Sequence, residues 1–205
     1  MHPIITPEII KAGISFPEFR QVMQSLLAEG KSTGTNQSEF LTELSKSNLT
    51  RMDKAEALPL LPELVESLEQ INRPLIWLII NEGWCTDAAH NVPLLANLAA
   101  CSSQIELHII LRSEYPEVMD AYLTNGGRSI PKLICLDAES ITELGTWGPR
   151  PANAQELAYK LKKEDKRPIT EIIQKMDDWA EQDKGQSLQK EFLDLVSNWK
   201  QANKG

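Results

Sequence analysis

The stretch that decides the fold is PLIWLIINEGWCTDAAHNVP, residues 74–93. Its first part, PLIWLIIN, is almost entirely apolar and has the length of a β-strand, which is typical of a central strand covered on both faces. The following stretch, CTDAAHNVPLLANLAAC, has its leucines at helical spacing and predicts an α-helix. Trp84 and Cys85 stand between the two. The pattern therefore places a thiol at a strand-to-helix junction.

Further strands follow in an order typical of an α/β protein. The sequence predicts strands at IELHIIL (105–111), KLICLD (132–137) and ITELGTW (141–147), and a short helix in YPEVMDAYLTNGG. Because a helix separates the first two strands, we expect them to be parallel, with a right-handed crossover. The last two strands are adjacent in the sequence, which favours a mixed sheet.

Charge and hydropathy exclude several classes of partner. The 205 residues include 29 acidic and 21 basic side chains, a net charge of −8, so the phosphates of nucleic acid would be repelled. No apolar run approaches the ~20 residues of a membrane span, and the N-terminal stretch lacks the pattern of a signal peptide. We therefore expect a cytoplasmic protein with no nucleic-acid or membrane partner, and the oligomeric state stays open.

The three cysteines, Cys85, Cys101 and Cys135, are widely spaced and form no CxxC pair. Such spacing is a poor disulfide framework and fits a reducing compartment. Cys101 lies ~24 Å from Cys85 along the helix, and Cys135 lies ~13 Å from Pro131 along a strand, whereas a disulfide needs Cα atoms within about 7 Å. Both are interpreted as buried apolar residues. The histidines are scattered, and we expect no metal site and no cofactor.

Opposing effects act on Cys85. A thiol at a helix start lies beside unpaired backbone N–H groups and the positive end of the helix dipole, which lowers a cysteine pKa. The negative charge of Asp87 acts in the other direction, and the sequence does not decide between them. Pro93, inside the helix, predicts a kink. The Ile130–Pro131 bond precedes a strand, and a proline at such a position often has a cis peptide bond, which is then a specific local feature of the fold.

Together, these residues resemble the thioredoxin fold. In that family two cysteines are spaced CxxC, a kinking proline follows the second by five residues, and a cis-proline loop packs against the active thiol. The resemblance makes Cys85 the nucleophile, Pro93 the kink proline, and Ile130 and Pro131 the cis-proline loop. The phrases GWCTDAAHNVP, LTNGGRSIPKL and WGPRP are similar to a bacterial branch of the family, some members of which carry alanine at the second cysteine position.

The departures from the family pattern bear on function. Ala88 occupies the position of the resolving cysteine, so the usual intramolecular disulfide cannot form. Ile79 stands where the family has a buried acid. Two functions stay open. The first is a single-cysteine thiol-disulfide oxidoreductase that acts through Cys85 on a protein disulfide, with an external low-molecular-weight thiol as the resolving group. The second is a redox-inactive binding module that uses the cis-proline loop to recognise a protein.

Each neighbour of the site has a functional and a structural interpretation. Trp84 either contacts a substrate or packs against the fold. Arg128 either supports a thiolate and guides an anionic partner, or is an ordinary surface arginine. Arg150 is expected to pair with a buried acid near the start of the last helices. His90 lies ~140° around the helix from Cys85 and is a poor general base for it.

The resemblance covers roughly residues 73–160 and divides the chain into three parts. Residues 1–72 form an N-terminal helical extension, residues 73–160 the thioredoxin-like core, and residues 161–205 a C-terminal helical extension packed on the core. In the last part, five apolar residues at helical spacing predict a packing face, with a dimer or partner surface as the alternative: Trp179, Phe192, Leu195, Val196 and Trp199. The expected fold class is α/β, with a mixed central sheet and helical extensions at both ends.

Overall fold

The computed structural model describes residues 4–164 and 168–201. One mixed sheet has the strand order β2-β1-β3-β4. Its strands are β1 (Leu75–Asn81), β2 (Ile105–Leu111), β3 (Lys132–Asp137) and β4 (Glu143–Trp147). β1 pairs in parallel with β2 and antiparallel with β3, and β3 pairs antiparallel with β4. The mixed sheet expected from the sequence is confirmed.

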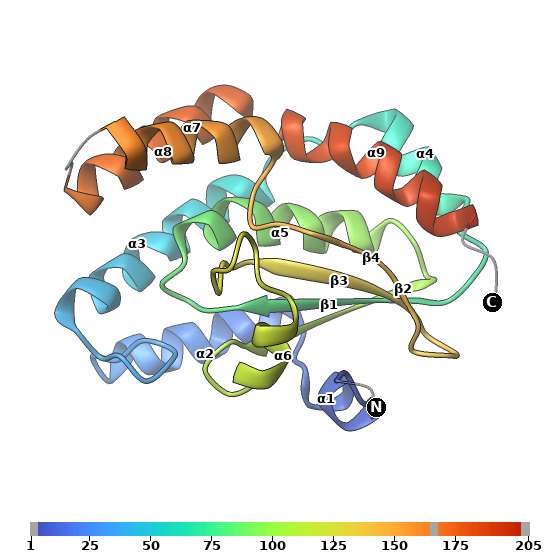
Figure 1. Ribbon diagram of the computed structural model, residues 1–205, viewed down its shortest axis with the longest axis horizontal. Coiled ribbons are helices and arrows are strands. Elements are labelled where there is room, and N and C mark those ends of the chain that lie inside the picture. Colours follow the sequence, from blue (N-terminus) through green and yellow to red (C-terminus); the bar gives the residue numbers. More distant parts are fainter. Residues whose placement is uncertain (1–3, 165–167, 202–205) are drawn as a thin grey trace.

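Helices cover both faces of this sheet. In the described residues they are α1 (Pro7–Ala12), α2 (Phe16–Ala28), α3 (Glu39–Glu56), α4 (Pro62–Glu69), α5 (Thr86–Ala100), α6 (Pro116–Ala121), α7 (Ala152–Glu164), α8 (Ile169–Asp183) and α9 (Gln186–Gln201). Figure 1 shows α5, α7, α8 and α9 on one side of the sheet, and α2 and α6 on the other. Helices from both ends of the chain, such as α2 and α9, therefore lie against the sheet.

The apolar sequence of β1 explains its position inside the sheet. All seven residues of β1 are buried, as the uninterrupted apolar run predicts for a strand covered on both faces. One of them, Trp77, packs edge-to-face against Phe192 and Trp199 of α9, with ring centroids 5.4 and 5.8 Å away. The last helix thus completes the core above β1.

The predicted apolar face near the C-terminus is only partly buried. Phe192, Val196 and Trp199 are buried, whereas Trp179 and Leu195 are half-buried. Trp179 belongs to α8 and lines a cavity rather than the aromatic core. The predicted face is not continuous, because Trp179 lies on α8 and the other four residues lie on α9.

The three cysteines are free thiols. Cys135 is fully buried on β3, opposite Trp77 of β1, and burial raises the pKa of its thiol to about 12. Cys101 is half-buried at the end of α5. In the ranges that the structure describes, no helix combines the length and apolar character needed to cross a membrane.

Candidate functional site

Cys85 occupies the N-cap position of α5, immediately after β1 and a short turn. The turn is closed by a hydrogen bond from the backbone N–H of Cys85 to the carbonyl of Glu82, with N and O 3.1 Å apart. The thiol Sγ–H donates to the carbonyl oxygen of Ile130 at 3.1 Å. The Ile130–Pro131 peptide bond is cis. The structure therefore brings together Cys85, Ile130 and Pro131, which are 45 or 46 residues apart in the chain.

The environment of Cys85 favours the neutral thiol. Cys85 is only 7% exposed. This burial, together with the negative charge of Asp87, raises the pKa of the thiol to about 12. Backbone N–H groups of Ala88 and Asp87 and the charge of Arg150 lower the pKa, but by less. The competition that the sequence left open is thus decided by desolvation.

Asp87 and Arg150 form an ion pair beside the thiol. Arg150 Nε donates to Asp87 Oδ1 at 2.9 Å, and Arg150 Nη2 donates to Asp87 Oδ2. The two side chains are 22% and 13% exposed. The pair joins the first turn of α5 to the segment after the cis Gly148–Pro149 bond. Arg150 therefore pairs with an acid at the entrance to the last helices, as expected from the sequence, but this acid is half-buried rather than buried.

This pair gives opposite expectations for two substitutions. Asp87→Asn removes a negative charge beside Cys85 and should lower its pKa by about one pH unit, whereas Arg150→Gln should raise it. Because alkylation proceeds through the thiolate, the rate for Cys85 at pH 9 should rise about tenfold in the first variant and fall in the second. The measurement uses a Cys101→Ser/Cys135→Ser background. Acceleration in both variants would indicate loosened structure and contradict the electrostatic explanation.

The turn before Cys85 is held by the N-terminal part of the chain. The backbone N–H of Gly83 donates to Thr33 Oγ1 at 2.7 Å, and its carbonyl accepts from Asn48 Nδ2 at 2.8 Å. Thr33 and Asn48 are 2% and 0% exposed. Neither contact is predictable from the sequence, since a threonine in a polar loop and an asparagine in a helix carry no local signal of a contact 50 or 35 residues away.

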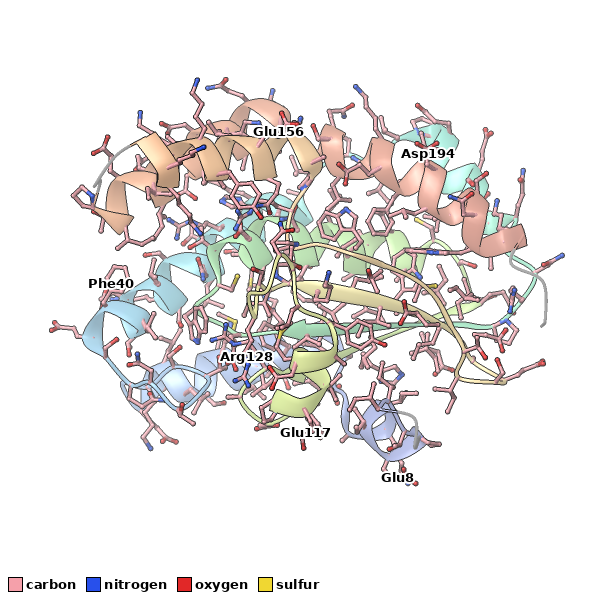
Figure 2. The ribbon with its side chains drawn as sticks, in the orientation of Figure 1. Glu8, Phe40, Glu117, Arg128, Glu156 and Asp194 are labelled. Atoms are coloured by element: carbon pink, nitrogen blue, oxygen red, sulfur yellow. The ribbon has the colours of Figure 1, made fainter. Side chains whose placement is uncertain are left out.

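A cavity of about 340 Å³ opens beside the thiol. Its apolar walls come from helices outside the predicted core: Phe40, Leu41 and Leu44 on α3, and Ile169, Ile173 and Met176 on α8. Figure 2 shows Phe40 at the outer end of α3, and 41% of this residue is exposed. Helices α3 and α8, which carry no site motif, therefore line the cavity beside Cys85.

Trp84 and Arg128 also line this cavity. The Arg112 guanidinium lies 4.7 Å from the centre of the Trp84 ring, and its Nη1 donates to the Arg128 carbonyl at 2.9 Å. The Arg128 side chain is half-exposed and binds both carboxylate oxygens of Asp120, at 2.6 and 2.7 Å. Trp84 thus lies at the cavity wall under a cation, whereas the Arg128 guanidinium has a surface partner.

The remaining predicted residues support the junction. Ala88 and Pro93 are buried in α5, which continues past the proline to Ala100. His90 donates from Nε2 to Asp177 Oδ1 of α8 at 2.7 Å, so it is engaged away from the thiol. Among the described side chains, no three histidine, cysteine or acidic residues are grouped so as to hold a metal ion.

Comparisons with known proteins agree with this fold. A family model described as thioredoxin matches residues 34–167. The fold is similar to the crystal structure of a protein of unknown function from Pseudomonas aeruginosa, with a TM-score of 0.57 and 20% identity, covering 92% of this chain and 94% of that one. It is also similar to an HIV epitope-scaffold, with a TM-score of 0.55 and 22% identity, covering 93% and 96%. No curated protein matches the chain. With two thirds of its sequence inside the family match, the chain belongs to the thioredoxin family.

Proposed function

We propose that the protein is a thiol-disulfide oxidoreductase that works through Cys85 alone and uses an external thiol to resolve its intermediate. The observation that carries this proposal is the position of the Cys85 thiol, 3.1 Å from the Ile130 carbonyl beside the cis Ile130–Pro131 bond, at the wall of a cavity. Once the thiol is uncovered, its sulfur can be reached by a disulfide that enters the cavity, beside the loop that carries Ile130 and Pro131.

The chemistry requires two exchanges at one sulfur. The Cys85 thiolate attacks the low-molecular-weight sulfur of a mixed disulfide between a protein and a small thiol. The disulfide bond breaks, the protein leaves as a thiolate that takes up a proton, and Cys85 retains the small group. A second molecule of the small thiol, as its thiolate, then attacks the retained sulfur. The products are a small symmetric disulfide and the regenerated Cys85 thiolate, so no resolving cysteine is needed at Ala88.

The neighbouring residues have consistent roles in this proposal. Ile130 and Pro131 present backbone groups to the substrate, and Trp84 forms part of the wall against which it rests. Arg112, stacked on Trp84, adds positive charge near an anionic small thiol. Three free cysteines fit a reducing compartment, and we place the protein in the cytoplasm.

A redox-inactive binding module is the second candidate. It is favoured by the burial that raises the pKa of Cys85 to about 12, because a thiol of this kind is almost entirely protonated at neutral pH. In this alternative Cys85 is a packing residue, and the cavity with its cis-proline loop recognises a protein segment. The oxidoreductase, by contrast, needs the thiol to become accessible to water and substrate during turnover.

Turnover separates the two candidates. A protein thiol blocked with glutathione serves as substrate, reduced glutathione as the external thiol, and release of the protein thiol as the readout. We expect the Cys101→Ser/Cys135→Ser variant to catalyse the release, and additional Cys85→Ser to lower the rate by at least about a hundredfold. A rate no higher than that of the uncatalysed exchange would remove the oxidoreductase and leave the binding module.

A further inference from the structure

A single carboxylate on α8 joins this helix to α3 and α5. Asp177 accepts from Arg51 of α3 through two hydrogen bonds, Nε to Oδ1 at 2.9 Å and Nη2 to Oδ2 at 2.6 Å. It also accepts from Nε2 of His90 on α5 at 2.7 Å. Burial acts to raise the pKa of Asp177, but hydrogen bonds from His90 and Arg51 outweigh it and hold the pKa at about 2. Asp177 is therefore a charged acceptor, which makes strong hydrogen bonds.

These contacts continue to the turn that precedes the thiol. Arg51 Nη1 donates to Asn48 Oδ1 at 3.3 Å, and Asn48 Nδ2 donates to the Gly83 carbonyl at 2.8 Å. Gly83 stands two residues before Cys85. A continuous path of hydrogen bonds thus runs from α8, through α3, to the backbone of the active-site turn. The position of α8 and the position of this turn are linked through Arg51 and Asn48.

Few side chains of α8 are buried. In the described structure only one of its residues, Ile172, is buried. The cavity beside Cys85 lies along one part of the helix, and a second cavity of about 610 Å³ lies along another, between α8 and helices α3 and α5. Asp87, Arg150 and Met176 line both cavities. Because side chains that face a cavity lose dispersion contacts, the position of α8 depends strongly on its polar partners.

We propose that Asp177 is a positioning residue whose hydrogen bonds to Arg51 and His90 hold α8 over the Cys85 cavity. We call these hydrogen bonds the latch, and their release exposes the thiol to a disulfide substrate. Ile169, Ile173 and Met176 of α8 form the wall that moves away. The inference rests on the proposed function for its biological use, since it supplies the step that uncovers a buried thiol. The accessibility of Cys85 is itself measurable without any turnover.

The test compares alkylation of the individual cysteines by iodoacetamide in the full-length protein, read by peptide mass spectrometry. In Asp177→Asn, we expect Cys85 to react at least about tenfold faster than in the wild type. Cys135 is the internal control, because it is as deeply buried as Cys85 but lies on β3, away from α8. Its rate should not change.

A matched variant tests whether the effect belongs to Asp177. Glu181 lies on the same helix and pairs with Lys54 of α3 at 2.7 Å, but the two side chains are 62% and 66% exposed. Glu181→Gln should leave the Cys85 rate unchanged, since exposed ion pairs contribute little. His90→Gln removes one of the three bonds to Asp177 and provides a milder second variant, with a severalfold acceleration confined to Cys85.

Two results would overturn the latch. An unchanged Cys85 rate in folded Asp177→Asn and His90→Gln would show that α8 does not control access. Equal acceleration of Cys85 and Cys135 would show that the substitutions loosen the whole fold. Since iodoacetamide needs only an accessible thiolate, Cys85-selective acceleration supports the latch even if catalysed exchange is absent. Catalysed exchange with an unchanged alkylation rate leaves the proposed function in place and removes the latch.

Discussion

Phe192→Ala should lower the free energy of unfolding by about 3–5 kcal/mol, the cost of deleting a fully buried aromatic side chain. Phe192 has no exposed surface and lies between three tryptophans. Its ring centroid is 5.4 Å from Trp77, 5.5 Å from Trp147 and 5.8 Å from Trp199, all in edge-to-face geometry. The substitution removes contacts to β1, to β4 and within α9 at once, and leaves a cavity above the sheet.

Guanidinium unfolding of the two proteins, followed by tryptophan fluorescence and circular dichroism, measures this loss. Asp194→Ala is the matched control, because Asp194 is an exposed residue of the same helix (Figure 2) and its replacement should change stability by less than about 0.5 kcal/mol. A loss below about 1 kcal/mol for Phe192→Ala would mean that α9 does not complete the core.

Gly148→Ala should lower the free energy of unfolding by a similar amount, because of the backbone conformation at this position. Gly148 has a φ of +110°, which residues with a side chain rarely adopt. A Cβ there would clash with the carbonyl oxygen of Pro131. Because the clashing atom belongs to the cis-proline loop rather than to a flexible side chain, the loop itself has to move. We expect a loss of at least about 3 kcal/mol, from backbone strain and displaced structure together.

A second glycine separates these two contributions. Gly126 also has a positive φ, +78°, but an added Cβ there would meet no atom within 4 Å. Gly126→Ala should therefore cost only about 1 kcal/mol, the price of the backbone conformation alone. Thermal and chemical unfolding of both variants provide the comparison. Equal losses at the two positions would show that the close approach of Gly148 to Pro131 is not important for the fold.

The core of the fold was predictable because its signals are local. The run PLIWLIIN predicts a strand buried on both faces, and β1 is buried throughout. The resemblance carried by Trp84-Cys85, Pro93 and Ile130-Pro131 implies a thioredoxin-like fold, which the family match and the mixed sheet confirm. Each of these signals lies within a short stretch of sequence, and the family resemblance implies how the stretches are brought together.

The surroundings of the thiol were not predictable in the same way. A cysteine at a helix start suggests a lowered pKa, but burial raises the pKa of Cys85 to about 12. Part of the cavity wall around Cys85 is α8, which begins more than 80 residues later. Asn48 and Asp177 were missed for the same reason: an amphipathic helix shows which face is apolar, but not which distant carbonyl or guanidinium its polar residues meet.

The most direct test of the central claim is the site of the mixed disulfide. The folded Cys101→Ser/Cys135→Ser variant is incubated with oxidised glutathione and analysed by intact and peptide mass spectrometry. We expect one glutathione on Cys85, removed again when reduced glutathione is added, and none after the further change Cys85→Ser. If Cys85 remains a free thiol in the folded protein throughout the incubation, it is not a nucleophile for disulfides, and the oxidoreductase proposal is wrong.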